Sequence, residues 1–159
     1  MRASSPFTID RWDPNGHAVE ISTGTPLAGA YIVRSFTGGD IEGRSEVLFA
    51  GAFSEEHGSG TYVAIDSFEG SVLGRAGAFS FWHTNTMTRG RSGRGDGILR
   101  IVPDSGTGQL EGIRGTGEII ASGDEHTLVL DIEFSDDETG FDADVVTEIA
   151  GEVEGRADA

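Results

Sequence analysis

One segment of the chain, residues 76–88, combines groups that can move protons with apolar side chains. Side chains alternate between the two faces of a strand, so a strand here carries on one face Phe79, Phe81, His83, Asn85 and Met87. An imidazole titrates near working pH, and an amide can orient a ligand against an apolar wall. His83 is therefore our first candidate for a general acid or base. Its alternative role is a histidine that only hydrogen-bonds and packs between strands.

The preceding segment, residues 61–72, adds a carboxylate to a similar face. Alternation places Asp66 on the same side as Tyr62 and Phe68. On a dry aromatic wall such a carboxylate becomes a useful proton donor or acceptor, or the partner of an imidazole. The alternative is an acid at the rim facing solvent, because most acids of so acidic a chain must be exposed. We predict catalytic roles for His83 and Asp66.

Other candidates for ligand contact are charged or phenolic side chains inside apolar strand segments. Arg34 and Arg100 must be paired if they are buried, either with a Glu across strands or with a ligand carboxylate. The phenol of Tyr31 can bind a ligand carbonyl or pack in a core or interface. The predicted ligand-binding set is Tyr31, Tyr62, Phe68, Phe79, Phe81, Asn85, Met87, Arg34 and Arg100.

A series of strands must position these residues. The chain has 25 glycines, four prolines, no cysteine and short alternating apolar segments, which indicate an all-β protein. Residues 13–27 form a predicted long loop over one end, with a short strand near 19–22. Eight strands would suit closure into an antiparallel barrel, which removes exposed edges. The predicted strands are 6–12, 28–37, 43–53, 61–72, 76–88, 96–103, 109–121 and 126–135.

The end of the chain has a different composition from the rest. At 159 residues one domain is expected, and we assign residues 1–135 to the barrel and residues 136–159 to an acidic C-terminal extension. Its apolar residues recur at four-residue spacing, which fits a short amphipathic helix. A flexible solvated tail fits the composition equally well.

Charge and motif content exclude several classes of function. The formal charge is −16, and all 11 basic residues are arginine, so we expect no nucleic-acid partner even though residues 89–94 superficially resemble an arginine–glycine RNA-binding segment. The segment is better explained as a loop between two strands. The chain lacks an apolar run that could span a membrane, and we expect a cytoplasmic protein. Without cysteine, and with scattered histidines, no metal site or other cofactor is predicted.

A glycine-rich segment supplies the most specific resemblance. Residues 102–117 read Val-Pro-Asp-Ser-Gly-Thr-Gly-Gln-Leu-Glu-Gly-Ile-Arg-Gly-Thr-Gly, a pattern typical of sharply bent strand pairs. Together with residues 7–13, 36–43, 68–79 and His83, this segment resembles a bacterial domain-of-unknown-function family (three-two-two-four) with an allene-oxide-cyclase-like barrel, and more distantly allene oxide cyclases and dirigent proteins. The resemblance implies an eight-stranded antiparallel barrel with a cup for a small, mostly apolar molecule.

The residues and the resemblance together give a hypothesis about function. We expect a cofactor-independent cyclase or isomerase that confines a small, mostly apolar substrate in the lumen, as in natural-product biosynthesis. The alternative is a non-catalytic carrier or sensor barrel for a small molecule. A homo-oligomer is expected if Ile65 and Trp82 face outward, because such apolar side chains would need a partner.

Overall fold

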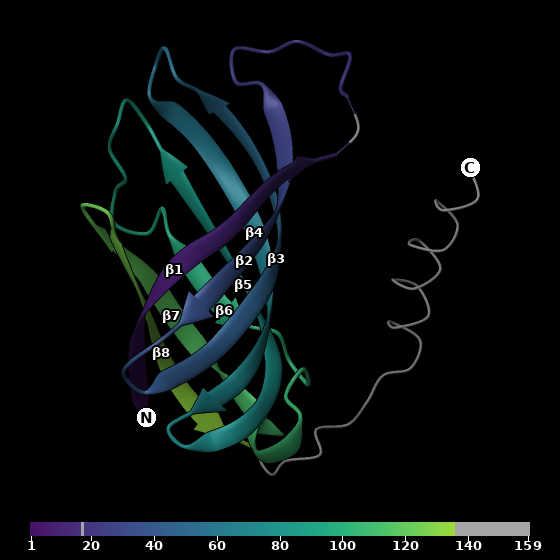
Figure 1. The fold of residues 1–159 in the computed structure, drawn as a ribbon. Helices are drawn as coiled ribbons and strands as arrows, with labels where there is room; N and C mark the ends of the chain where they lie inside the picture. Colours follow the sequence, from purple (N-terminus) through teal and green to yellow (C-terminus); the bar gives the residue numbers. More distant parts are fainter. Residues whose placement is uncertain (17, 136–159) are drawn as a thin grey trace.

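Eight antiparallel strands form a closed barrel in the computed structural model, which describes residues 1–16 and 18–135 (Figure 1). Each strand pairs with its neighbours along the chain, and β8 returns to pair with β1. The predicted all-β, eight-stranded architecture is therefore confirmed, while the predicted acidic extension lies outside the described residues. The strands are β1 (Arg2–Asn15), β2 (Leu27–Phe36), β3 (Ile41–Ser54), β4 (Ser59–Val72), β5 (Arg75–Met87), β6 (Ile98–Ile101), β7 (Ile113–Ser122) and β8 (Glu125–Phe134).

The predicted strand limits differ from the observed ones mainly at three places. β1 is longer than expected and starts at Arg2, because its first half pairs with β8. The sixth strand shortens to Ile98–Ile101, and the glycine-rich segment forms the 3-10 turn η1 (Gly108–Leu110) before β7 begins. Residues 18–26 contain no strand, so the short strand predicted near 19–22 was wrong.

One end of the barrel is filled by a packed core. Its side chains come from every strand and from η1, and its phenylalanine rings lie in chains of contact, with the centroids of Phe68 and Phe79 5.2 Å apart. Phe36 and Phe68 meet edge to face at 5.6 Å. This close packing leaves the lumen to the opposite end.

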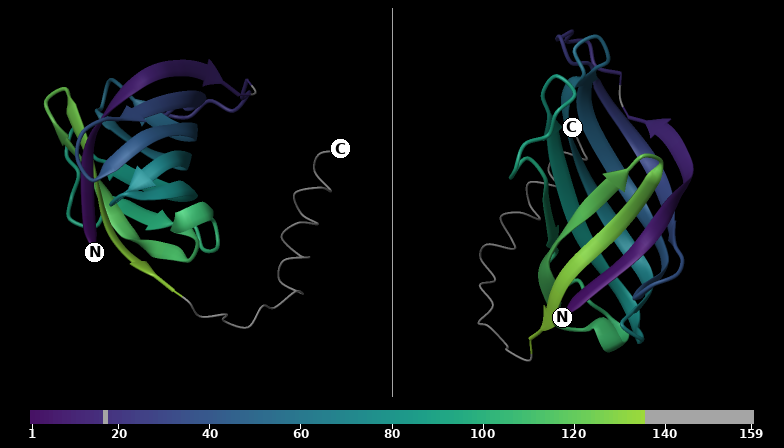
Figure 2. Two further views of the ribbon diagram at one scale, coloured as in Figure 1. Left: turned by 60° about the horizontal axis from the view of Figure 1, so that its bottom comes forward. Right: turned by 90° about the vertical axis from the view of Figure 1, so that its left-hand side faces the viewer.

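The other end of the barrel is open. β1 pairs with β8 only from Arg2 to Phe7, and beyond a register shift between Ile9 and Arg11 it pairs with β2 alone. Ile9 and Trp12 lie opposite buried residues of β2, on the inner side, and yet they are 44% and 49% exposed. The separation of β1 from β8 is visible in Figure 2. The barrel is therefore a cup with a packed base.

Close strand approach at the base depends on a row of glycines. Gly43, Gly70 and Gly77 pair side by side across β3, β4 and β5. Gly70 has φ +156, and a Cβ there would collide with the backbone carbonyl oxygen of Glu42. The Glu-Gly pairs at 42–43 and 69–70 therefore lie inside strands where only glycine fits.

Replacing Gly70 with Ala is expected to lower the free energy of unfolding by about 3 kcal/mol, because backbone must shift to admit the methyl group. Gly74→Ala is the matched control, since Gly74 also has positive φ (+76) but nothing lies within 4 Å of its added Cβ. Its cost is expected to be about 1 kcal/mol. Urea unfolding of both variants measures the difference, and equal costs would show that the close approach is unimportant.

Candidate functional site

A buried cluster of charged and polar side chains lies between the packed base and the open end. Four neighbouring strands supply it: Arg34 from β2, Ser45 from β3, Asp66 from β4 and His83 from β5. Alternation along each strand turns these residues inward, and Arg34, Asp66 and His83 are 5%, 0% and 3% exposed. Because these charged groups are almost fully buried, they must form ion pairs and hydrogen bonds with one another.

Asp66 is the centre of the cluster. Its Oδ1 accepts hydrogen bonds from Arg34 Nη1 and Ser45 Oγ, both at 2.9 Å, and its Oδ2 lies 3.1 Å from His83 Nε2. The expectation that a buried arginine is paired is met, but by an Asp two strands away rather than by a Glu. Charge-assisted contacts of this kind fix the carboxylate in one orientation.

The imidazole of His83 has a partner on each nitrogen. Nε2 faces both an acceptor, Asp66 Oδ2, and a donor, Arg34 Nη1 at 3.3 Å, while Nδ1 lies 3.0 Å from the phenol oxygen of Tyr62. With the proton on Nε2, the ring donates to Asp66 and accepts from Tyr62. With the proton on Nδ1, it accepts from Arg34 and donates to Tyr62. The first tautomer is the better satisfied, because in the second the lone pair of Nε2 also faces Asp66 Oδ2 at 3.1 Å.

Tyr62 connects this cluster to the open end. Burial raises the pKa of its phenol, and the charge of Asp66 adds to the effect while that of Arg34 opposes it. The phenol therefore keeps its proton at neutral pH. Its ring stacks on Phe49 at 5.4 Å and meets His83 edge to face at 5.3 Å.

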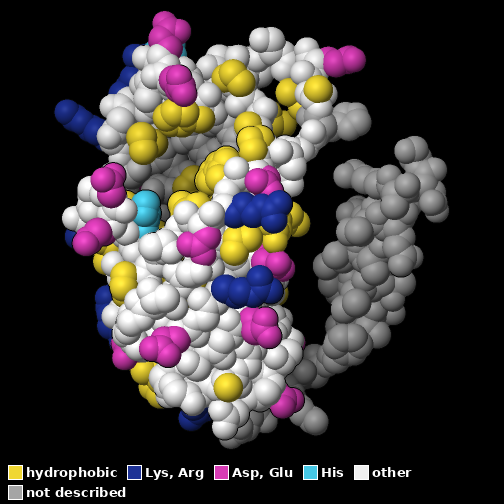
Figure 3. Space-filling model, viewed as in Figure 1, with side chains coloured by type: hydrophobic (Ala, Val, Ile, Leu, Met, Phe, Trp, Pro, Cys, Tyr) yellow, Lys and Arg dark blue, Asp and Glu magenta, His cyan; other side chains and the backbone are white. Residues whose placement is uncertain are grey.

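The open end contains a large, mainly apolar cavity of about 800 Å³. Tyr62 and Asn85 lie in its wall, and the loop before β2 contributes Thr23 and Pro26, which agrees with the predicted loop over one end. Figure 3 shows the hollow near the top of the molecule with hydrophobic side chains around it. A cavity of this size accommodates an organic molecule of drug-like dimensions. Its apolar walls include Pro26, Ala28, Phe49, Ala52, Phe53 and Met87.

A second cavity, of about 290 Å³, adjoins the first. His83 lines it, and Tyr62 and Asn85 line both cavities. Its far wall is the loop between β5 and β6, with Arg94 and three glycines. The cluster therefore reaches ligand-accessible space through Tyr62 and, on the other side, through His83.

The structure brings together most of the predicted site residues. His83 and Asp66 are in hydrogen-bonding distance, with Arg34 and Tyr62 in the same cluster. Asn85 and Met87 line the larger cavity as a ligand-binding set would require. Their functional roles stay predictions.

Five predicted ligand contacts lie elsewhere. Phe68, Phe79 and Phe81 belong to the packed core and line neither cavity. Tyr31 faces outward, where its hydroxyl donates to Glu46 at 2.9 Å. Arg100 is also on the outer face, because its neighbours Leu99 and Ile101 point inward. Their predicted roles in ligand binding stay predictions, to which neither cavity adds support.

Several residues of the buried cluster and of the cavity walls were not predicted. Ser45, a partner of Asp66, has no distinguishing pattern in the sequence, although its position in an alternating strand was a usable signal. Phe49 lies on the inner face of β3 and was not singled out, although the charged residues Glu42, Arg44 and Glu46 on the other face were a usable signal. Arg94 lies in a segment interpreted only as a connecting loop.

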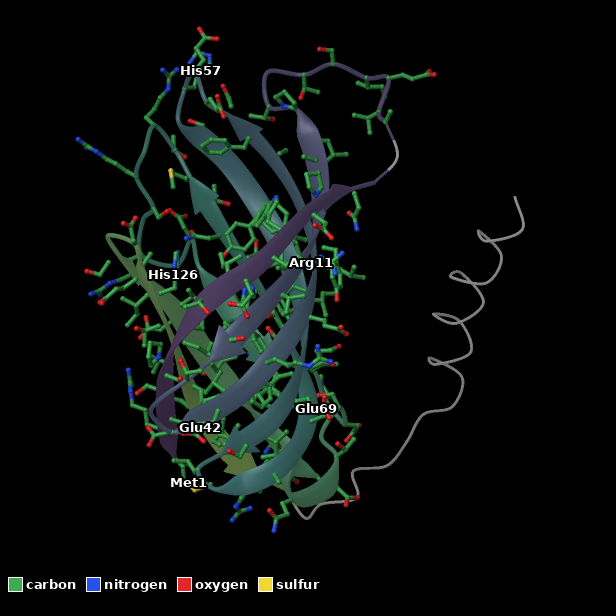
Figure 4. The ribbon with its side chains drawn as sticks, viewed as in Figure 1. Met1, Arg11, Glu42, His57, Glu69 and His126 are labelled. Carbon is green, nitrogen blue, oxygen red and sulfur yellow. The ribbon has the colours of Figure 1, made fainter. Side chains whose placement is uncertain are left out.

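Other site types find no support in the part of the chain that the structure describes. His57 stands at the top of the barrel and His126 on β8, well apart in Figure 4, and no three His, Asp or Glu side chains among the described residues converge as metal ligands. The described residues also include no helix long and apolar enough to cross a membrane. The cytoplasmic location stays a prediction.

Comparisons with known proteins agree with the fold. A model of the family described as "Protein of unknown function (DUF3224)" matches residues 3–134, which include every strand of the site. A solved structure of a DUF3224 protein with unknown function from Shewanella oneidensis MR-1 is 28% identical, with a TM-score of 0.76, and the match covers 86% of this chain and 98% of that chain. No curated protein matches the sequence.

Proposed function

The chain belongs to the DUF3224 family, whose description names no activity, and from the geometry of its interior we propose that it is a cofactor-independent isomerase or cyclase. Its substrate would be a small, mostly apolar molecule held in the open end of the barrel. The proposal rests above all on the hydrogen-bonded series from Tyr62 through His83 to Asp66, which begins at the cavity wall and ends in a buried ion pair.

The two tautomers of His83 suggest how Tyr62 would act. When Nδ1 carries the proton, the imidazole donates to the phenol oxygen and Nε2 accepts from Arg34, whose charge would offset the repulsion between Nε2 and the Asp66 carboxylate. The phenol proton is then free to point into the cavity, towards a carbonyl or epoxide oxygen of the substrate. Donation of that proton leaves a phenolate that the Nδ1 proton stabilises, and the proton returns when the product forms. No net proton or electron is exchanged, as an isomerisation requires.

The cavity would supply the other part of catalysis. Ring closure of a flexible molecule is slow in solution because few of its conformations bring the reacting atoms together. The rigid apolar wall built from Phe49, Phe53 and Met87 would restrict those conformations. Exclusion of water would also protect a reactive intermediate from hydrolysis.

Product analysis tests the proposal. Small molecules that co-purify with the protein are identified by mass spectrometry, and the identified compound or an apolar epoxide resembling it is incubated with wild type and with His83→Ala. We expect wild type to isomerise the compound and the variant to lose at least about 100-fold in rate while still binding it. Unchanged turnover in His83→Ala would remove the histidine from the mechanism.

A non-catalytic carrier or sensor is the second candidate. The complete burial of Asp66 favours it, because a fully partnered carboxylate also serves to hold a binding wall in place. In the same experiment, a carrier would return the bound compound unchanged from wild type.

The predicted homo-oligomer stays a proposal that an outer apolar row supports. Leu48, Ile65 and Trp82 lie side by side on the outer faces of β3, β4 and β5, and Leu48 and Ile65 are more than half exposed. Apolar side chains in such a row are covered in many assemblies. Light scattering would show one species of higher mass than the single chain.

A further inference from the structure

The loop between β5 and β6 concentrates positive charge at the cup. Arg89, Arg91 and Arg94 fall within six residues, and they are three of the chain's 11 basic residues in a protein with net charge −16. Dark blue side chains stand beside the upper rim of the hollow on the side of this loop (Figure 3). In so acidic a chain, a local group of cations is expected to be neutralised by nearby acids.

Among the described residues, the arginines of this loop form no ion pair. The arginines that do so are Arg2, Arg11, Arg34, Arg44 and Arg114. Asp96, the acid within the loop, instead accepts a hydrogen bond from the backbone N–H of Gly93. The charge of Arg94 is therefore available to a ligand.

Arg94 is the arginine of the loop that lines a cavity. The smaller cavity around it is mainly polar, whereas the larger one has apolar walls, and the two share Tyr62 and Asn85. Asn85 Oδ1 is buried without a hydrogen-bond partner at this junction. A single ligand could thus place an apolar body in the larger cavity and a polar end in the smaller one, with Tyr62 beside the crossing point.

The acidic residues around the two cavities favour one orientation of an anionic ligand. Glu55 and Glu56 lie at the larger cavity and would repel an anion there. Glu118 lines the smaller cavity, but Arg2 lies 3.6 Å from its carboxylate and offsets its charge. The charged end of an anionic ligand would therefore favour the side of Arg94.

We propose that the ligand of this barrel is an amphipathic anion, with a carboxylate or similar group bound by Arg94 and an apolar body in the larger cavity. The inference rests on the proposed function, whose cavity and Tyr62 it uses. It narrows the substrate class from a small apolar molecule to one with a charged end, which would fix the position of the reacting atoms relative to the phenol.

Calorimetric titration with decanoate and with decanol tests this directly, because the two probes share a chain and differ in charge. We expect wild type to bind decanoate more tightly than decanol. Arg94→Gln should weaken decanoate binding about tenfold, which is the size of one charge-assisted contact, and should leave decanol binding unchanged. Arg91→Gln removes the same charge from the same loop without touching either cavity, and it should change decanoate affinity less than about twofold.

Other outcomes separate this inference from the proposed function. Equal weakening by Arg91→Gln, or none by Arg94→Gln, would mean that the anion is not bound at Arg94. If wild type binds decanol as tightly as decanoate, the proposal that the ligand has a charged end is wrong, while the larger cavity stays a candidate site for an apolar ligand. Failure of wild type to bind either probe would overturn the inference and the proposed function together.

Discussion

Replacing Asp66 with Asn is expected to lower the free energy of unfolding by about 3–5 kcal/mol. The change keeps the shape of the side chain but leaves the guanidinium of Arg34 buried without its carboxylate at 2.9 Å. The amide keeps one acceptor oxygen, so the contacts of Ser45 and His83, which use different carboxylate oxygens, cannot both be retained. Since a domain of this size is stable by about 5–15 kcal/mol in total, the variant should unfold at a much lower urea concentration.

An exposed ion pair provides the matched control. Arg114 Nε lies 3.0 Å from Glu133 Oε1 on the outer face, with both side chains more than half exposed. Glu133→Gln removes the same type of charge, yet solvent screens the pair, so the cost should stay below about 1 kcal/mol. If Asp66→Asn costs no more than this control, the buried cluster does not stabilise the barrel.

A double replacement distinguishes pairing from burial. Arg34→Met with Asp66→Leu removes both charges and keeps apolar volume, so it should recover most of the stability lost in Asp66→Asn. Such a result would mean that stability does not require the ion pair. We would then infer that the ion pair serves to hold His83 and Tyr62 in position.

Strand alternation predicted part of this cluster from the sequence. The positions of Asp66 in 61–72 and of His83 in 76–88 placed each on the face with more aromatic residues, and those faces are the inner ones. The contact between them could not be derived, because it depends on the register of β4 against β5, which pairs Asp66 with Phe81 and Ala64 with His83.

The predicted ligand contacts that lie away from the cavities have a related cause. Tyr31 and Arg34 are three residues apart, so a regular strand must turn them to opposite faces, and both could not bind the same ligand. The phenylalanines lie on the expected inner face but in the packed base, since alternation gives the side of a sheet and not the distance along the barrel. That distance separates packed core from open cavity.

Loops limited the prediction of the cavity. The loop segment 23–26 contributes to the larger cavity and the segment 93–97 to the smaller one, and neither segment has a periodic pattern from which a position could be inferred. Arg94 gains a candidate role because the antiparallel order puts the loop after β5 at the same end as the loop before β2, and closure of the barrel brings both loops around the open end. A site whose residues meet only in the closed barrel cannot be predicted from the pattern of single strands.

Replacing Tyr62 with Phe is expected to lower kcat by about 100-fold or more, if the protein is the proposed isomerase. The variant keeps the ring that stacks on Phe49 at 5.4 Å, so decanol should bind as well as it does to wild type. Tyr31→Phe is the control, because it removes the same hydroxyl from the outer face, where it bonds Glu46. Turnover of Tyr31→Phe should equal that of wild type.

The pH profile separates a proton-donating phenol from one that only packs. Because burial raises the pKa of Tyr62, the donor form persists through neutral pH, and the rate should fall only as pH rises above the usual range for tyrosine. The residual activity of Tyr62→Phe should lack this alkaline limb. If the variant instead keeps full activity with an unchanged profile, the phenol is not the donor, and His83, which lines the smaller cavity, would have to reach the substrate directly.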